Sequence, residues 1–482
     1  MLNYTTIFVS ISVLLLSNLS ARKTYAKSVV LIGGNLQDVQ SGDESGTAIY
    51  RKIIELSEEA EEAKVGIFTT ASISKAIAQE KAEKYAANFN DSGVTDVEWI
   101  PFHIENCASE QNSQAIASLI KTRTVLFFGG GLTSHNFECF FEQQADGRFD
   151  ESLVAETIRH AHDSGAVIAG NSAGAMIQTG SPLIEGGESY QALVSGALES
   201  SSQSNLQRPP EETLAPVSRQ INGQLDRRQL LGAAMSLRYS QRGGLGFFPY
   251  GPVDTHFSER GRQGSLIRFS SDTNQPLSFG IDENTALVVT DSGTPDAVMS
   301  VVGDGGVSIF DLRQSEVDSV NGFWSIVGVN MSYLTQGDSF KSNDKSIDFA
   351  SWKVPFASSD QPMEIAPSNN IFSSLGPSLR RLMSVLTLCN SADIVKSVLS
   401  DRPNEREFIT IAFSLFESPK TSVSSRTFES DPVTYVVRLS EKDSEGSQGL
   451  IGRNSLGKEI VSFKDLIVQI APETDVDYDS RE

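Results

Sequence analysis

The stretch from Ala166 to Ile177, AVIAGNSAGAMI, decides the fold of this 482-residue chain. A short apolar strand runs into the G-x-S-x-G turn of Gly170 to Gly174, and we expect a helix to follow. Such a turn between a strand and a helix exposes its serine at the edge of a sheet. We therefore predict Ser172 as a nucleophile and the Ala173 N–H as an oxyanion donor, against the alternative of a tight turn without a catalytic role.

Strand and helix patterns alternate around this turn. We expect strands at 28–32, 64–70, 94–100, 124–128 and 166–169, and helices at 46–62, 74–88, 113–121 and 151–164. This alternation predicts an α/β fold with a mostly parallel sheet flanked by helices. Ligands bind such sheets beyond the carboxyl ends of the strands. Three of these ends are glycine-rich, namely Gly33-Gly34, Gly129 to Gly131, and Gly170.

The chain divides into segments of different composition. Residues 1–26 hold an apolar run too short to span a membrane, followed by small residues typical of signal-peptide cleavage. We expect export or secretion and no membrane contact after cleavage; the alternative is a buried helix or an uncleaved anchor. Residues 27–345 are the expected catalytic domain, with a polar surface insertion at 198–229. Residues 346–482 are an expected C-terminal α+β extension of unknown role, with a helix at 379–399 and strands at 407–416, 434–439 and 460–470.

Composition argues against several classes of function. The formal net charge of −22 disfavours nucleic acid as a partner, because phosphate backbones repel an acidic surface. The glycine-rich loops lack the lysine of a nucleotide-binding P-loop, and the histidines and cysteines lack metal-ligand spacing, so we expect no cofactor and no metal. The three cysteines allow one disulfide and one free thiol, with the pairing left open among Cys107, Cys139 and Cys389.

A nucleophilic serine needs a base and an acid that orients it. The five histidines are His103, His135, His160, His162 and His256. His256 stands in the polar stretch DTHFSERGR (254–262), after an apolar and glycine-rich segment, and is the expected base. Acid candidates include Glu185, Glu188, Asp254, Asp282 and Glu283, and the sequence alone leaves Asp282 and Glu283 equally open. The expected order of serine, histidine and acid differs from that of the α/β-hydrolases.

Several motifs in the same order resemble one family. SAGA (172–175), DTHFSERGR (254–262) and GIDE (280–283) are similar to motifs of the cyanophycinases and the aspartyl dipeptidases (dipeptidase E). The resemblance runs from about residue 28 to about residue 340. It implies a class I glutamine-amidotransferase-like fold and a serine peptidase, with Ser172 as nucleophile, His256 as base and Glu283 as its orienter. It also implies Gly130 as a second oxyanion donor and gives a weak indication of a homodimer.

The resemblance further implies a substrate. Cyanophycinases release β-Asp-Arg dipeptides, so we expect hydrolysis of aspartyl or isoaspartyl peptide bonds through an acyl-enzyme. The expected substrate-binding residues are Leu132, Asp254, Thr255, Arg260 and Arg262. The family pattern has glutamine at positions 132 and 255 and arginine at 265, where this chain has Leu132, Thr255 and Ser265. These departures leave two alternatives open, namely a non-catalytic peptide-binding protein of the same fold and a serine esterase.

Overall fold

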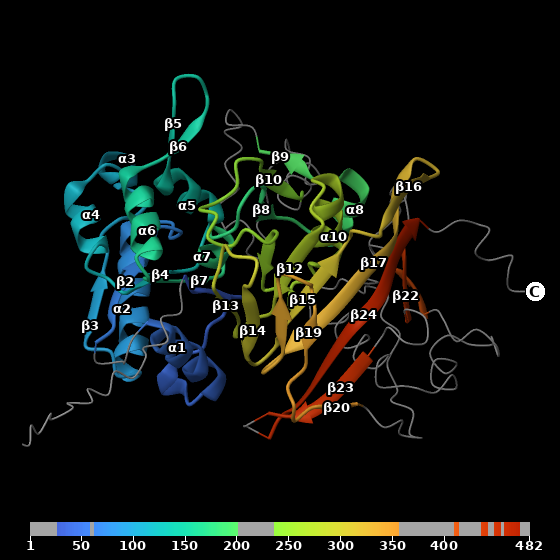
Figure 1. The fold of residues 1–482 in the computed structure, drawn as a ribbon. Coiled ribbons are helices and arrows are strands. Elements are labelled where there is room, and N and C mark those ends of the chain that lie inside the picture. The colour runs from blue at the N-terminus through green and yellow to red at the C-terminus, as the bar shows by residue number, and fades with distance from the viewer. Residues whose placement is uncertain are drawn as a thin grey trace, which may run out of the picture.

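The computed structural model describes residues 27–57, 62–200, 236–355, 409–413, 435–441, 448–454 and 457–472. The expected signal peptide, the insertion beyond residue 200, the helix expected at 379–399 and Cys389 lie outside the described residues. The order of described elements along the chain is shown in Figure 1.

Within the described ranges the first sheet has nine strands, five of which are adjacent and mutually parallel. The parallel strands, in spatial order, are β1 (Val29–Ile32), β7 (Val167–Asn171), β4 (Val125–Phe128), β2 (Lys64–Phe68) and β3 (Asp96–Trp99). The antiparallel strands beyond β1 are β13 (Thr285–Thr290), β14 (Val298–Gly303), β18 (Ser339–Lys341) and β19 (Ile347–Asp348). The central parallel strands are buried, as short β-branched and aromatic runs require when helices cover both faces.

Helices cover the parallel strands on both faces. One apolar cluster packs α1 (Glu44–Ser57) and α2 (Lys75–Asp91) on one face. The other face packs α3 (Cys107–Glu110), α4 (Gln114–Ile120), α5 (Thr133–Phe140) and α6 (Leu153–Asp163). Serine hydroxyls cap the first turns of α2, α4 and α6, which explains where these helices begin. The expected α/β class with a mostly parallel sheet between helices is confirmed for the part of the first sheet from β1 to β3.

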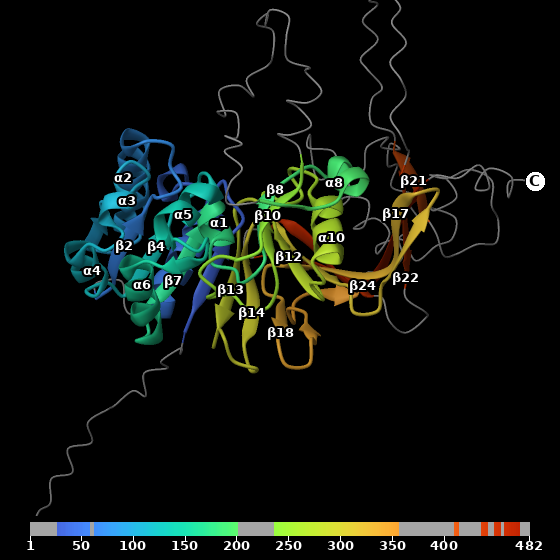
Figure 2. The same cartoon turned by 90° about the horizontal axis from the view of Figure 1, so that it is seen from above.

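A second sheet lies beside the first and includes the C-terminal strands (Figures 1 and 2). Its main path runs through β11 (Val253–Thr255), β12 (Leu277–Ile281), β15 (Gly306–Asp311), β17 (Phe323–Thr335), β24 (Glu459–Pro472), β22 (Tyr435–Glu441) and β21 (Ile409–Phe413). Three further strands attach to it, namely β16 (Glu316–Val320), β20 (Val354–Pro355) and β23 (Gln448–Arg453). Because β24 pairs with β17, the C-terminal strands extend the sheet that begins at β11. The division at residue 345 stays a prediction.

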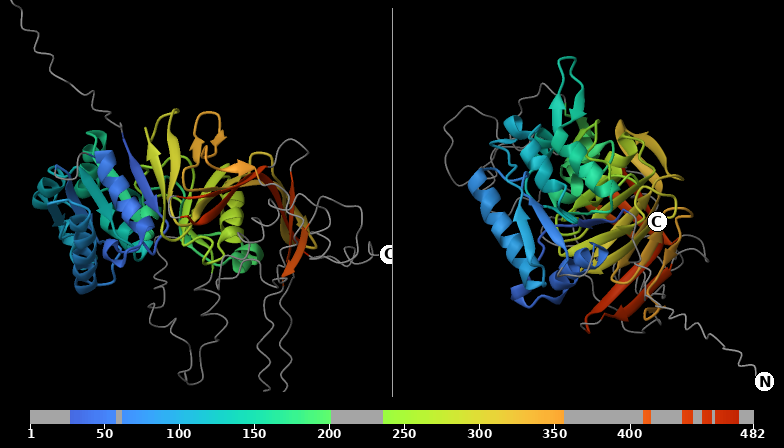
Figure 3. Two further views of the ribbon diagram at one scale, coloured as in Figure 1. Left: turned by 90° about the horizontal axis from the view of Figure 1, so that it is seen from below. Right: turned by 60° about the vertical axis from the view of Figure 1, so that its left-hand side comes forward.

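Smaller elements complete the described chain. They are the 3-10 helix η1 (Val39–Ser41), β5 (Phe141–Gln143), β6 (Phe149–Glu151), α7 (Ala173–Met176), β8 (Leu183–Gly186), α8 (Ser189–Ser195), β9 (Leu198–Glu199), β10 (Arg238–Ser240) and α10 (Gln263–Asp272). β5 and β6 form a hairpin, and β8, β10 and β9 form a small third sheet. In two further views, helices α1 to α6 again lie on one side and the C-terminal strands on the other (Figure 3). No helix within the described ranges has the length and apolar character needed to cross a membrane.

Candidate active site

Ser172 lies at the sharp turn that follows β7. Its backbone has φ 55° and ψ −120°, a conformation that non-glycine residues rarely adopt. The flanking glycines are sterically required, since a Cβ at Gly170 would lie 2.1 Å from the Gly174 carbonyl oxygen. The Ser172 N–H donates to the Ile32 carbonyl at 2.9 Å, which fixes the turn to β1. The expected helix is only the single turn α7, so its dipole adds little electrostatic stabilisation at Ser172. The sharp turn itself presents the Ser172 side chain.

His256 follows β11 of the second sheet and also has a positive φ, of 51°. Its N–H donates to the Gly33 carbonyl at 2.6 Å, which joins this loop to the end of β1. The imidazole lies directly over Gly34, where a Cβ would come within 2.2 Å of the ring. The Gly33-Gly34 pair at the end of β1 therefore makes room for the histidine.

Glu283 lies between β12 and β13, where the chain passes from the second sheet to the first. Its Oε1 is 2.6 Å from His256 Nδ1, and His256 Nε2 is 2.9 Å from Ser172 Oγ. With Nδ1 protonated toward Glu283, Nε2 can accept the Ser172 proton. The structure thus brings the predicted nucleophile, base and acid into one hydrogen-bonded chain at the junction of the two sheets.

The two adjacent carboxylates left open by the sequence have different surroundings. Asp282 is fully buried, and it accepts the Ser258 N–H at 3.0 Å and the Tyr333 hydroxyl at 2.6 Å. Glu283 instead reaches His256, while its Oε2 accepts Asn35 Nδ2 at 3.0 Å. Glu283 is therefore placed to orient the base, and Asp282 holds the loop. Sequence reasoning missed Asn35, although it directly follows the Gly33-Gly34 pair.

The electrostatics of the site suit a general base. Burial lowers the pKa of His256 below its usual value of 6.5, and the positive charge of Arg260 lowers it further. The hydrogen bond and charge of Glu283 act in the opposite direction but do not outweigh these effects. The imidazole therefore stays neutral to lower pH than an exposed histidine and can accept a proton at neutral pH.

The glycine-rich loop after β4 lies beside the nucleophile. A Cβ at Gly130 would be 3.2 Å from Ser172 Cβ and 3.7 Å from Ser172 Oγ, so this position is open to a reacting group only because it is glycine. The Gly130 N–H, predicted as an oxyanion donor, is directed at the Tyr85 hydroxyl at 3.4 Å. On the other side of Ser172, the Ala173 carbonyl accepts Asn136 Nδ2 at 3.1 Å, which ties α7 to α5.

The chain is similar in sequence to several cyanophycinases. Cyanophycinases from Synechococcus elongatus and Thermosynechococcus vestitus are each 36% identical to the chain over 103 residues. The cyanophycinase of Trichormus variabilis is 27% identical over 287 residues, which cover 59% of this chain and 74% of that protein. The chain is cyanophycinase-like. The resemblance inferred from the motifs is confirmed.

The extent of these similarities differs. The first two alignments cover 20% of this cyanophycinase-like chain and 30% of the length of each relative. No model of a known protein family matches. A peptidase from an acI-B1 actinobacterium aligns with a TM-score of 0.41 and 18% identity, over 66% of this chain and 97% of that one. A putative peptidase E protein from Listeria monocytogenes aligns with a TM-score of 0.31 and 12% identity, over 57% and 97%.

The expected substrate-binding residues of the cyanophycinase-like site do not all face solvent. Arg260 is exposed and Leu132 is half-buried, just before α5. Asp254 is enclosed and accepts Arg262 Nη1 at 2.5 Å. Thr255 is also enclosed, with its hydroxyl 3.5 Å from Met176 Sδ. Asp254 and Thr255 therefore lie behind the site, and direct contact with a substrate would require a rearrangement.

Position 265, the third departure from the cyanophycinase pattern, is also closed to solvent. Ser265 is fully buried in the first turn of α10, where its N–H donates to the Ser189 hydroxyl at 3.1 Å. Its own hydroxyl donates to the Arg262 carbonyl at 2.9 Å. This serine therefore ties α10 to α8 instead of offering a charge to a substrate.

The other described histidines have contacts or positions that do not involve Ser172. His162 is buried and its ring contacts the Ala166 carbonyl, His135 contacts the Ser72 carbonyl, and His103 stacks on Trp99. His160 is exposed on α6. Within the described ranges, no three histidine, cysteine, aspartate or glutamate side chains gather as a metal site.

A disulfide links α3 to α5, the helix that follows the glycine loop. Cys107 of α3 bonds to Cys139 of α5, with a Cα–Cα distance of 5.1 Å. The structure thereby decides a pairing that the sequence left open, because a pairing depends on distances in space. The cross-link fixes α5, the helix that begins directly after the glycine loop and contacts the Ala173 carbonyl.

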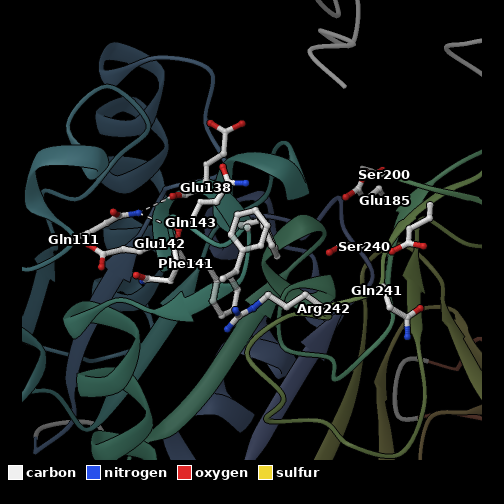
Figure 4. A pocket seen from close by; sticks show the side chains of 15 residues that line it. Gln111, Glu138, Phe141, Glu142, Gln143, Glu185, Ser200, Ser240, Gln241 and Arg242 are labelled. Carbon is white, nitrogen blue, oxygen red and sulfur yellow. Dashed lines mark hydrogen bonds between the residues drawn. The ribbon is translucent and has the colours of Figure 1, made fainter. Parts of the chain in front are cut away.

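A cavity of about 1230 Å³ among the described residues is separate from these candidate catalytic groups. It lies between the β5–β6 hairpin and the small third sheet, with Phe141 and Arg242 at its centre in Figure 4. Arg242 stacks on the Phe141 ring at 3.9 Å from its centroid. Ser172, His256 and Glu283 are not among the residues that line it. Sequence reasoning did not predict this cavity.

Proposed function

We propose that this cyanophycinase-like chain is a serine peptidase that hydrolyses aspartyl or isoaspartyl peptide bonds of the β-Asp-Arg type. The observation that carries the proposal is the hydrogen-bonded chain from Ser172 through His256 to Glu283. The similarity to cyanophycinases supports the same reaction class.

The chemistry follows from these positions. His256 Nε2 takes the proton of Ser172 as Oγ attacks the carbonyl carbon, and Glu283 stabilises the resulting imidazolium. The tetrahedral oxyanion accepts hydrogen bonds from the N–H groups of Ala173 and the glycine loop. The imidazolium then protonates the leaving amine, which yields an acyl-enzyme on Ser172. Water, activated by His256, attacks the acyl carbon and releases the acid, which restores the serine.

The substrate class rests on complementary charge. A β-Asp-Arg unit carries the free α-carboxylate of its arginine, and a guanidinium binds a carboxylate through two parallel hydrogen bonds. Arg260 is exposed close enough to His256 to lower its pKa. Arg262, whose Nη1 is bound to Asp254, supports the same edge of the site.

A peptide-binding protein without catalysis is the second candidate. The departures from the cyanophycinase pattern at Leu132, Thr255 and Ser265 favour it, because a site built to hydrogen-bond its substrate loses affinity when those groups change. A serine esterase is the third candidate, since the same elbow and base could act on simple esters.

We also propose that the protein is exported. The buried Cys107–Cys139 disulfide supports this, because such bonds persist in oxidising compartments and are rare in the cytosol. Mass spectrometry of the protein from its native host, with and without reduction, would test both the disulfide and cleavage near residue 26. Reduced cysteines and an intact N-terminus would contradict export.

Hydrolysis by the protein from residue 27 onward tests the peptidase proposal. The substrates are cyanophycin, β-Asp-Arg oligomers, aspartyl dipeptides and an aryl ester. The matched variants are Ser172→Ala and the exposed control Ser118→Ala. Release of β-Asp-Arg that is lost only in Ser172→Ala supports the proposal. Turnover of the ester alone favours the esterase, and binding of peptide without turnover in any variant favours the non-catalytic protein.

A further inference from the structure

The glycine loop beside Ser172 is held from one face of α2. Lys81 Nζ donates to the Gly130 carbonyl at 3.0 Å, and the Tyr85 hydroxyl accepts the Gly130 N–H at 3.4 Å. Lys81 and Tyr85 are four residues apart, so they lie one above the other on the same side of the helix. One glycine is thus bound at both its polar backbone atoms by a single helix.

Tyr85 also contacts the strand that carries the nucleophile. Its hydroxyl accepts Asn171 Nδ2 at 3.1 Å, and Asn171 directly precedes Ser172. Its ring packs on Phe127 at 4.7 Å between centroids, and a Cβ at Gly129 would lie 2.8 Å from the ring. The Tyr85 hydroxyl therefore bridges the end of β7 and the glycine loop, the two segments that must keep a fixed spacing around an oxyanion.

Lys81 adds an electrostatic effect. The carbonyl that it binds belongs to the same peptide unit as the Gly131 N–H, and a cation on the carbonyl makes that N–H a stronger donor. The Gly130 N–H is directed at Tyr85, whereas the Gly131 N–H donates to no atom among the described residues. The Gly131 N–H is therefore the donor of this loop that is left for an oxyanion.

We propose that Lys81 and Tyr85 are positioning residues of the oxyanion site, which hold the loop so that Gly131, and not Gly130, provides the second donor beside Ala173. This inference rests on the proposed serine mechanism. It changes the donor that the family resemblance implied, and it assigns α2 a role in the reaction.

The test is the rate at which a fluorophosphonate labels Ser172. In this reaction Ser172 Oγ forms a bond to phosphorus, fluoride leaves, and His256 takes the proton, so no peptide substrate is needed. We expect Lys81→Met to label about 10- to 100-fold more slowly and Tyr85→Phe about 3- to 10-fold more slowly. Lys81→Arg keeps the charge and should recover most of the rate. The matched control is Lys84→Met, whose lysine is on the same helix but pairs with Asp38 at 3.1 Å.

A second readout separates positioning from general damage. The melting temperatures of the variants should match that of the wild type, and on any peptide that is cleaved kcat should fall while KM stays unchanged. Lys81→Met labelling at the wild-type rate, or Lys84→Met slowing equally, would overturn the proposal. A wild type that is labelled but cleaves no aspartyl peptide contradicts only the proposed substrate, and the variants still decide this inference. A wild type that is not labelled overturns both.

Discussion

Two of the short contacts between a basic and an acidic side chain in the described residues differ in their access to solvent. His256 Nδ1 and Glu283 Oε1 are 2.6 Å apart, and their side chains are 12% and 26% exposed. Lys353 Nζ and Asp338 Oδ1 are 2.7 Å apart, and both side chains are fully buried. Similar distances therefore occur in an open site and in a closed one.

Both side chains of the buried Lys353–Asp338 pair have further hydrogen-bond partners. Asp338 accepts the N–H groups of Thr335 and Ala350, both within 3.0 Å, and the Ser462 hydroxyl at 2.5 Å. Lys353 Nζ also donates to the Thr335 and Ser462 hydroxyls. Ser462 is in β24, so the pair joins the C-terminal strand to the end of β17. A closed, saturated pair holds structure together, whereas the open pair leaves His256 Nε2 directed at Ser172.

The largest expected effect is at the open pair. In Glu283→Gln the imidazole loses the anion that fixes its tautomer, so kcat/KM should fall about 1,000- to 10,000-fold with little change in the free energy of unfolding. Steady-state hydrolysis and urea unfolding measure the two quantities. The neighbouring Asp282→Asn should show the reverse pattern, with a destabilisation of about 1–3 kcal/mol. Equal losses of activity in both variants would contradict the assignment of Glu283.

Substitutions in the buried Lys353–Asp338 pair should change the free energy of unfolding more than the activity. Lys353→Met leaves the Asp338 carboxylate buried without its cation, so the free energy of unfolding should fall by about 3–5 kcal/mol. Urea unfolding measures this, while kcat per folded molecule stays near that of the wild type. Replacing both partners, as Lys353→Met with Asp338→Asn, removes the unpaired charge and keeps one oxygen acceptor for the buried N–H groups, so it should recover part of the loss. A loss below about 1 kcal/mol in the single variant would show that the pair does not stabilise the sheet.

The pH dependence of kcat/KM should show an effect of intermediate size. Activity needs neutral His256, whose pKa is lowered, so kcat/KM should be lost only as the pH falls through a value below 6.5. Arg260→Gln removes a positive charge that lowers this pKa, so the acidic limb should move to higher pH. Arg313→Gln, which removes a charge paired with Asp311, is the control and should leave the limb in place. A limb that moves to lower pH in Arg260→Gln would contradict the electrostatic account.

The smallest expected effect concerns Asn35. Asn35→Asp keeps the size of the side chain and tolerates the positive φ of 46°, but it replaces a donor to Glu283 with a second carboxylate. Loss of one hydrogen bond should lower kcat/KM several-fold. Kinetics at constant pH check this, with Gln40→Ala, at an exposed position nearby in η1, as the control. An unchanged kcat/KM would show that Glu283 needs no second support.

Local patterns predicted much of the fold. The strands expected at 28–32, 64–70, 94–100, 124–128 and 166–169 correspond to β1, β2, β3, β4 and β7, because buried parallel strands leave continuous apolar runs. The strand at 460–470 was also expected, but its pairing with β17 was not. Strand periodicity shows that a strand exists and cannot show which partner it has.

The supports of the site were not predictable in the same way. Tyr85 is 45 residues from Gly130 in the sequence, and Asn35 is 248 residues from Glu283. Neither lies in a motif that carries its role, because both act through contacts made only when separate strands and helices pack. The Cys107–Cys139 pairing and the large cavity near Phe141 depend on tertiary packing for the same reason.

By itself, the sequence determined the α/β class, the serine turn and the few residues from which a base and an acid could come. These are local properties, set by apolar periodicity and by glycines next to Ser172. The packing of separate elements determines that Glu283 contacts His256 while Asp282 is buried. It also places Lys81 of α2 in hydrogen-bond contact with the glycine loop. Asp282 directly follows β12 and Glu283 lies in the turn before β13, so one position in sequence separates a group inside the protein from a group facing the site.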